Sequence, residues 1–404
     1  FGSSAVARNP SGAAPLYRNP WMAPPRRAAH AGAPGCAWLR LGLLSLLATP
    51  LSAFRFDRRH AAPDQTGLSP EGGPAACSQP GTDTRFLCHG RPTRIPPIVL
   101  VKTHKTGSST AAQIVNRLGD RRNKRFMSPP DGSRMLGWPG PFPADLEERA
   151  TFDIISSHCV YNRSLMRRYM GASPFFVTLL REPGAQALSA YNFFAEVDGY
   201  NRSWQEHLAW LETAQPSADG VDAARFLNSQ AHDLGWYEYI GQTAAHDQDT
   251  WRVQAWLDTL EDDFVKNGTV ILTEYFDEGL VLLRRRLGLD MREVVYNRMF
   301  TGSYHSNVTR TEERRSRARR LNPVDVALHA HFNQTFQKAW AAASGPEREA
   351  ELAELRRLSA ELEAACSQRP PDLERCPAPF RWTPEEYHAY LRKKELLGCR
   401  EVGL

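Results

Sequence analysis

Short apolar runs alternate with amphipathic stretches through the middle of the chain. Four of these runs predict buried β-strands, at residues 98–101, 152–156, 175–180 and 269–273. Leucines at helical spacing predict an amphipathic packing helix over 346–365, and Thr383 followed by Pro384 has the residue types that begin a last helix. Strands alternating with helices predict an α/β fold with a doubly wound, mainly parallel sheet flanked by helices.

The segment after the first apolar run has the composition of an anion-binding loop. Residues 102–110 read Lys-Thr-His-Lys-Thr-Gly-Ser-Ser-Thr, and a helix is predicted over 111–118. A strand, loop and helix of this kind direct backbone N–H groups, hydroxyls and ammonium groups to the helix N-terminus, where the helix dipole favours an anion. The loop is not a Walker A motif, because Lys does not follow Gly107. The alternative is a capped turn that carries two lysines.

A second segment, residues 175–194, predicts another anion contact. Arg181 follows the strand, Pro183 lies near the start of a helix, and Ser189 comes eight residues after Arg181, about two turns into that helix. An arginine at a strand end and a hydroxyl on the next helix can bind one phosphate together, the arginine in a bidentate manner. The alternative is a surface ion pair and an ordinary helical serine.

The two segments together resemble the sulfotransferases that use 3′-phosphoadenylyl sulfate (PAPS). In that family a K-T-G-[ST]-[ST] core, here Lys105 to Ser109, binds the 5′-phosphosulfate. An R-[DE]-P element followed by S-x-Y, here Arg181 to Pro183 and Ser189 to Tyr191, binds the 3′-phosphate. The string KTHKTGSST resembles the Golgi galactose 3-O-sulfotransferases in particular, as do TEYFDEGLVLLRRRLG and ALHAHFNQTF. The resemblance runs from about residue 96 to about 340 and fades across 200–250.

This resemblance implies a P-loop-like sulfotransferase fold and a definite reaction. The chain is expected to transfer a sulfuryl group from PAPS to the 3-hydroxyl of a terminal β-galactose on a glycolipid or glycoprotein glycan. The alternatives are a non-catalytic lumenal glycan-binding relative and a nucleotide-dependent glycan kinase. The kinase would need acidic Mg²⁺ ligands beside the phosphate loop, and the sequence shows no strand ending in paired Asp.

Roles follow for the residues of both segments. Imidazole titrates near neutral pH, so His104 is the predicted general base, and the resemblance points to it too; the alternative is that it only hydrogen-bonds the loop. Lys105 is the predicted cation between the sulfuryl group and the leaving phosphate. The predicted cofactor-binding residues are Lys102, Thr103, Lys105, Thr106, Gly107, Ser108, Ser109, Thr110, Arg181 and Ser189.

Weaker candidates lie at other strand ends. His158, Glu274 and Asp277 could contact the acceptor, although a structural histidine and helix capping are at least as expected. One or two arginines of the run 310–320 could close over the cofactor phosphates, although a solvated helix face is the default expectation.

Composition is compatible with such an enzyme. The 404 residues are 42% hydrophobic, which is sufficient for a large core, and the net charge of +5 is too mild to indicate nucleic acid. A homodimer is possible. No Cys or His spacing suggests zinc, and no metal is expected.

The N-terminal part predicts membrane attachment. Residues 1–35 have arginines and no acidic residue, and 36–54 are mostly apolar and borderline in length for a bilayer. The positive-inside rule then predicts a cytosolic tail (1–35) and a type II signal anchor (36–54). A cleaved signal peptide is the alternative. Residues 55–95 predict a flexible stem, and 96–404 the lumenal catalytic domain in the Golgi.

Sequons and cysteines agree with a secretory placement. Five N-x-[ST] triplets are candidate glycosylation sites: Asn162, Asn201, Asn267, Asn307 and Asn333. Six of the seven cysteines follow the apolar segment, an even number suited to disulfides. The shortest loops would join Cys77 to Cys88 and two of Cys366, Cys376 and Cys399; Cys159 is the sixth.

Overall fold

A computed structural model of the chain describes residues 94–129, 135–144, 151–171, 173–197, 202–241, 249–299, 308–368 and 371–394. The predicted tail and anchor (1–35 and 36–54), and all but the last two residues of the stem, lie outside these ranges. Within them, no helix is both apolar enough and long enough to cross a bilayer.

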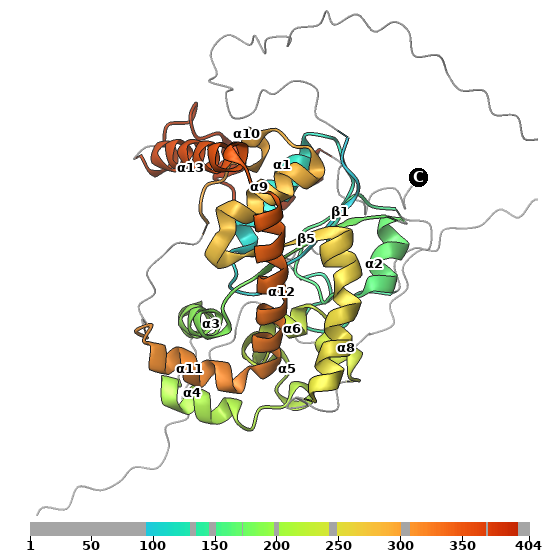
Figure 1. The fold of residues 1–404 in the computed structure, drawn as a ribbon, viewed down its shortest axis with the longest axis vertical. Helices are drawn as coiled ribbons and strands as arrows, with labels where there is room; N and C mark the ends of the chain where they lie inside the picture. The colour runs from blue at the N-terminus through green and yellow to red at the C-terminus, as the bar shows by residue number, and fades with distance from the viewer. Residues whose placement is uncertain are drawn as a thin grey trace, which may run out of the picture. The chain divides into compact units, whose positions relative to one another are not determined.

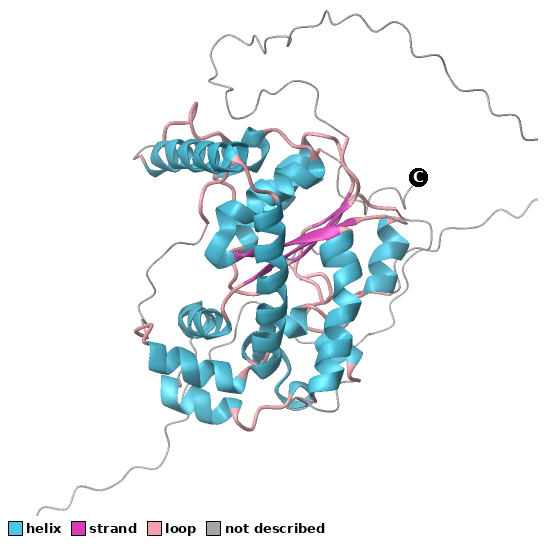
Figure 2. Ribbon diagram, viewed as in Figure 1, coloured by secondary structure: helices cyan, strands magenta, loops and turns pink. Residues whose placement is uncertain are grey.

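A five-stranded parallel sheet forms the centre of the described structure (Figure 2). Its strands are β1 (Ile98–Val101), β2 (Phe126–Met127), β3 (Ile154–Ile155), β4 (Phe175–Leu180) and β5 (Gly268–Leu272), in the order β2-β3-β1-β4-β5. Each neighbouring pair is parallel, with Ile98 of β1 opposite Ile154 and Phe175. The predicted α/β fold with its parallel sheet is therefore confirmed.

Helices cover both faces of the sheet. In chain order they are α1 (Ser108–Asp120), α2 (Arg163–Met170), α3 (Pro183–Val197), α4 (Trp204–Leu211), α5 (Pro216–Phe226), α6 (Ser229–Asp233), α7 (Trp236–Tyr239), α8 (Thr250–Glu261), α9 (Phe276–Leu287), α10 (Met291–Val294), α11 (Glu312–Leu321), α12 (Pro323–Ala342), α13 (Pro346–Ser367) and α14 (Pro384–Lys393). A π-helical turn (Asp262–Lys266) and two 3₁₀ turns (Thr273–Tyr275 and Ala378–Phe380) complete the described elements.

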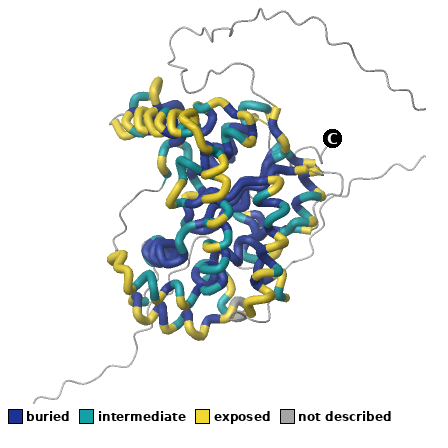
Figure 3. Tube along the Cα trace, viewed as in Figure 1, coloured by how far each residue is buried: buried dark blue, intermediate teal, exposed yellow. Residues whose placement is uncertain are grey.

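Alternation along the strands sorts these helices into two layers. Ile98 and Leu100 of β1 face a core shared with α1, α9, α10, α13 and α14, whereas Val99 and Val101 face a core shared with α2, α6, α7, α8 and α12. Figure 1 shows α12 crossing the sheet, and Figure 3 shows the strands as a continuous buried band. A sheet buried on both faces explains why its strands read as unbroken apolar runs.

A third apolar cluster lies around α3, α4, α5 and α11. The close approach of α3 and α11 needs a glycine: a Cβ on Gly184 would lie 2.7 Å from the backbone oxygen of Arg315. The first turn of α3, which follows the carboxyl end of β4, therefore contacts the arginine-rich α11 directly.

The C-terminal helices confirm two predictions. The helix expected over 346–365 is α13, and Thr383 caps α14 in a capping box with Glu386. A disulfide joins Cys366 to Cys376, which is one of the pairs expected from the shortest loops. Cys77, Cys88 and Cys399 lie outside the described residues.

Two expectations about secretory chemistry have mixed outcomes. Cys159 is a buried free thiol, so it does not take part in the disulfides to which the even number of cysteines is suited; burial raises its pKa to about 12. Among the sequons, Asn267 is exposed, whereas Asn162 caps α2 and Asn333 is half-buried on α12. Asn201 and Asn307 lie outside the described residues.

Candidate functional site

The loop between β1 and α1 turns through two left-handed residues. Lys105 has φ of 60° and Gly107 has φ of 82°. A Cβ on Gly107 would meet nothing nearer than a Phe276 carbon at 4.0 Å, so the backbone conformation, and not lack of space, requires glycine here. A left-handed lysine costs on the order of 1 kcal/mol, and strain of this kind is found mainly at functional sites.

Hydroxyl groups inside the loop hold this conformation. The Thr103 hydroxyl contacts the carbonyl oxygen of Leu179 and lies 2.8 Å from the Thr106 hydroxyl. The hydroxyls of Thr106 and Ser108 lie 3.0 and 2.8 Å from the carbonyl oxygen of Thr103. Thr103 and Thr106 are fully buried, so their side chains brace the loop and do not line the cleft beside it.

A cleft of about 570 Å³ lies beside the loop, at the carboxyl end of the sheet. It brings together most of the predicted site residues: His104, Lys105, Gly107, Ser108, Ser109, Thr110, His158, Arg181 and Ser189. Three further arginines also line it, at positions 225, 298 and 310. The described lining thus holds five cationic side chains and no Asp or Glu, which is the charge pattern that fits a polyanionic ligand.

Arg181 is held in the cleft by neutral groups. Its backbone N–H donates to the Gln230 side-chain oxygen at 2.8 Å, and its carbonyl accepts from the Gln230 amide nitrogen at 2.9 Å. Its Nη1 donates to the carbonyl oxygen of Lys105 at 3.1 Å. Burial, and then the neighbouring Arg310, lower the pKa of Arg181. An anion in the cleft would relieve both effects, because it offsets lost hydration and separates like charges.

Lys105 occupies the same end of the cleft. Its Nζ lies 3.6 Å from the centre of the Phe193 ring. Burial, with a smaller contribution from Arg181, lowers the pKa of Lys105 from 10.5 to about 8. The ammonium group is thus less stable in the cleft than in water, and a bound anion would favour its charged form.

His104 is fixed on the other side of the loop. Its Nδ1 and its backbone nitrogen each lie 2.8 Å from Oδ2 of Asp233, at the end of α6. The imidazole ring stacks on His158 at 4.3 Å between centres and lies 4.4 Å from the Trp138 ring. With Nδ1 engaged, Nε2 is the ring nitrogen that can meet a substrate in the cleft.

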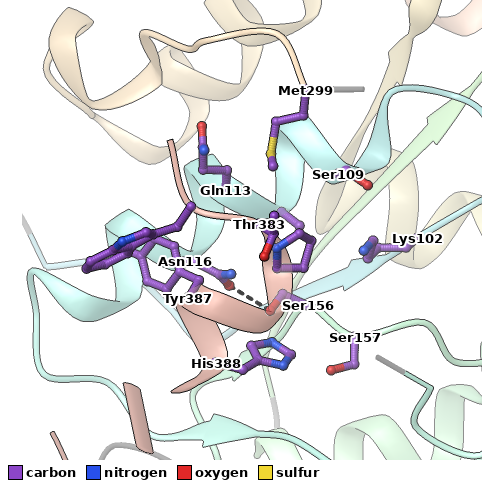
Figure 4. Close-up of a pocket in the computed structure, with 13 residues that line it drawn as sticks. Lys102, Ser109, Gln113, Asn116, Ser156, Ser157, Met299, Thr383, Tyr387 and His388 are labelled. Carbon is purple, nitrogen blue, oxygen red and sulfur yellow. Dashed lines mark hydrogen bonds between the residues drawn. The ribbon is translucent and has the colours of Figure 1, made fainter. Parts of the chain in front are cut away.

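Lys102 lies on the far side of the loop from the cleft. It is 2% exposed and lines a second, small cavity of about 10 Å³, close to the least space that holds one water molecule. Figure 4 shows Lys102 with Ser157 and His388 around this cavity, and the 2.7 Å hydrogen bond from Ser156 to Asn116 beside them. Ser109 and Met299 line both cavities, and among the predicted cofactor residues Ser109 is the one that lines the small cavity with Lys102; the structure does not bring Lys102 into the cleft that holds the others.

Glu274 and Asp277 line a neighbouring cavity of about 420 Å³, which shares Gly107 and Thr110 with the cleft. Both carboxylates are engaged by the protein. Glu274 accepts the backbone N–H of Glu182 at 2.8 Å, and Asp277 accepts the Tyr296 hydroxyl at 2.6 Å. Burial alone would raise the pKa of Glu274, but hydrogen bonds from His329 and from the Glu182 amide leave it lowered. The two residues do not line the cleft that holds His104.

Comparison with known proteins agrees with this site. The sequence model of a family described as galactose-3-O-sulfotransferase matches residues 38–398. The chain belongs to the galactose-3-O-sulfotransferase family. It is 31% identical over 277 residues to human galactose-3-O-sulfotransferase 2, covering 67% of this chain and 68% of that protein. It is 30% identical over 275 residues to mouse galactosylceramide sulfotransferase, covering 67% of this chain and 63% of that protein.

Membership of the galactose-3-O-sulfotransferase family makes the chain a transferase and confirms the resemblance seen in its sequence. It favours the enzyme over the glycan-binding and kinase alternatives. Several residues of the site were nevertheless missed by sequence reasoning: Trp138, Arg225, Asp233 and Arg298. No local motif marks them, because each comes from an element outside the two phosphate-binding segments; Arg310 alone belonged to a run singled out beforehand.

Proposed function

We propose that this protein transfers a sulfuryl group from PAPS to the 3-hydroxyl of a terminal β-galactose on a glycolipid or glycoprotein glycan. The observation that carries the proposal is the cleft itself. Five cations, several hydroxyls and a helix N-terminus line it, with no Asp or Glu among the described lining residues. Such a site is suited to a donor with several negative charges, and His104 beside it is suited to deprotonate an alcohol.

The chain's own residues fit the two charged ends of PAPS. The loop amides, Ser108, Ser109 and Lys105 would hold the 5′-phosphosulfate at the start of α1. Arg181 and Ser189 line the same cleft and would hold the 3′-phosphate. The spacing of the two groups follows from adjacent strands, because β1 and β4 are paired and each leads into one of them.

When bound, PAPS supplies a sulfuryl group attached to a good phosphate leaving group. Nε2 of His104 takes the proton of the acceptor hydroxyl as the acceptor oxygen forms its bond to sulfur and the bond from sulfur to the phosphate oxygen breaks. Lys105 stabilises the negative charge that grows on the leaving phosphate and the sulfuryl oxygens. Fixed charges in a cleft of this kind stabilise a transition state because they need no reorganisation during the reaction.

The acceptor is proposed to enter at the His104 end of the cleft. Met135, His158, Phe194 and Arg225 line this end. Aromatic faces and a guanidinium group are suited to the apolar face and the hydroxyls of a sugar. The relatives' names cover both galactosylceramide and other galactose acceptors, so we propose terminal galactose as the common element.

The test is transfer of ³⁵S from labelled PAPS by the full chain. Galactosylceramide, lactose-type and Galβ1-3GalNAc acceptors would be compared, with Lys105→Ala, His104→Ala and, as a matched control, Lys338→Ala, which changes an exposed residue of α12. Label at the galactose 3-hydroxyl that is lost in the first two variants and kept in the control supports the proposal. If PAPS binds but no galactoside is labelled, galactose is not the acceptor. If PAPS does not bind, it is not the donor.

We also propose that the protein is a single-pass type II membrane protein of the Golgi, anchored by residues 36–54. The arginines before the apolar segment and the sequons after it support this orientation. Glycosidase digestion tests it: the native chain should lose mass, and Asn267→Gln, which removes an exposed sequon, should lose less. A chain from cells that is insensitive to glycosidase would contradict a lumenal catalytic domain.

A further inference from the structure

The short helix α6 contacts both functional segments of the cleft. Gln230, in its first turn, binds the backbone of Arg181 on both sides, and Asp233, at its end, binds His104. The helix is itself held by α12, because the Asp325 carboxylate accepts the backbone N–H groups of Gln230 and Ala231 at 3.2 and 2.7 Å. These hydrogen bonds fix the position of α6, and with it the position of Asp233.

The Asp233 carboxylate has one defined orientation. Oδ2 accepts from the backbone N–H of His104 and faces Nδ1 of the same residue, both at 2.8 Å. Oδ1 accepts from the Trp138 indole N–H at 2.8 Å. The Asp233 side chain is fully buried, and the His104 side chain that it contacts is 6% exposed. Since a carboxylate can only accept, the neutral imidazole of His104 carries its proton on Nδ1 and keeps the lone pair on Nε2.

We propose that Asp233 is the positioning residue of the catalytic histidine. It holds His104 in the Nδ1–H tautomer, so that Nε2 can accept a proton in the cleft, and this inference rests on the proposed sulfuryl transfer. When the acceptor hydroxyl gives its proton to Nε2, the imidazolium forms beside a fixed carboxylate. The acceptor oxygen's electron pair forms the new bond to sulfur, and the pair of the broken sulfur–oxygen bond leaves with the phosphate. The proton on Nε2 is later released to solvent.

Other charged or titratable groups around His104 must be considered in any pH profile. His158 stacks on the ring from the loop after β3, and His232 lies beside Asp233 on α6. Three cations line the same cleft as His104: Lys105 of the phosphate loop, Arg181 just after β4, and Arg225 of α5. Burial lowers the pKa of His232, which keeps it neutral near pH 7, so Asp233 is the negative group that contacts the His104 ring.

Steady-state kinetics of the full chain with PAPS and a galactoside test the proposal. Asp233→Asn keeps the shape of the side chain but can place a donor against Nδ1, so kcat should fall on the order of 100-fold or more, within the range of general-base catalysis. The KM for PAPS should stay within about twofold. The double variant Asp233→Asn/His104→Ala should be no slower than His104→Ala alone, because the two residues act as one unit. Asp258→Asn, on the exposed face of α8, is the matched control.

The pH dependence of kcat separates this role from a structural one. In Asp233→Asn the acid limb of the profile of kcat against pH should move to lower pH, because the His104 imidazolium no longer has the Asp233 carboxylate beside it. Retention of more than half of kcat, or losses that multiply in the double variant, would overturn the proposal. The proposal would also be overturned if Asp233→Asn lowered only the melting temperature and left the profile of kcat against pH unchanged.

A second measurement does not depend on turnover. ¹⁵N-histidine spectra of the full chain without substrates report which ring nitrogen carries the proton, and His104→Ala identifies the signal. The expected state is Nδ1–H, altered in Asp233→Asn; an Nε2–H state in the native chain would overturn the inference. A native chain that shows Nδ1–H but transfers no sulfuryl group would count against the proposed function only.

Discussion

Lys105 should make donor binding dependent on pH in mildly alkaline solution. Burial and Arg181 lower its pKa from 10.5 to about 8 in the free cleft. At 1.36 kcal/mol per pH unit, this difference means that the cleft disfavours the ammonium form of Lys105 by about 3 kcal/mol. An anionic donor beside Nζ favours that form, so binding should return the pKa of Lys105 toward its ordinary value.

The size of the effect follows from these two pKa values. Without the donor, Lys105 should be about 10% deprotonated at pH 7 and about 90% at pH 9, whereas in the complex it should stay protonated at both. Binding at pH 9 should therefore take up about 0.9 proton, and the affinity should be about tenfold weaker than at pH 7. Because the pKa of Lys105 is lowered, its positive charge is present below about pH 8 and is lost above it. The affinity for the donor should therefore be highest below pH 8 and decline above it.

Calorimetry with adenosine 3′,5′-bisphosphate, the product of the donor, measures both quantities. Titrations at pH 7 and pH 9, in two buffers with different ionisation enthalpies, give the affinity and the protons taken up. Lys105→Arg keeps a cation that does not titrate in this range, so its affinity should be insensitive to pH; Lys338→Arg is the exposed control and should behave as the native chain. A native affinity that changes less than threefold, or proton uptake that persists in Lys105→Arg, would refute the reasoning.

Four further predictions concern single contacts. Arg181→Lys loses the planar fork and should raise the KM for PAPS on the order of tenfold, with the melting temperature unchanged. Arg225→Ala, which removes a guanidinium 4.4 Å from the Phe194 ring at the acceptor end, should raise the acceptor KM on the order of tenfold and leave the KM for PAPS unchanged. Replacing Cys366 and Cys376 by Ser opens a loop with a sequence separation of 10, and should lower the free energy of unfolding by about 2–3 kcal/mol in urea titrations while activity at low temperature is kept. Burial raises the pKa of Asp325 from 3.8 to about 7, so the folded state binds a proton that the unfolded chain releases. The free energy of unfolding of the native chain should therefore fall by up to about 4 kcal/mol as the pH rises from about 4 to 7. Asp325→Asn should lack this fall, which unfolding titrations at each pH would measure.

Local patterns predicted the parts of the structure that local physics determines. A parallel strand is buried on both faces, so β1 and β4 could be recognised as apolar runs with the bounds that the structure has. Pro183 at the start of α3 and Thr383 at the cap of α14 mark helix ends by their own chemistry. Since strand carboxyl ends meet at one edge of a parallel sheet, the cleft could be predicted from two segments that are far apart in the sequence.

Long-range contacts could not be predicted in the same way. Asp233 lies 129 residues after His104, and no spacing rule connects a five-residue helix to a loop at that distance. The strand β2 has two residues, which is too short for a periodicity, and β3 is shorter than the apolar run that contains it. Lys102 shows a third kind of limit: whether a strand-end lysine faces the ligand or the interior depends on the course of the loop, which here turns it toward α14.

The arrangement of charge around the cleft explains how it can remain positive in a protein with nearly balanced charge. Arg181 is held by a glutamine side chain and a backbone carbonyl, and Lys105 lies over an aromatic ring. The neighbouring carboxylate of Glu182 accepts from the first amides of α3 and pairs with Arg319 of α11. Cations positioned in this way are fixed without carboxylate ligands inside the cleft, so their charge is available to an incoming polyanion. The cost of desolvating them is seen in the lowered pKa values of Lys105 and Arg181, and donor binding is the event that offsets it.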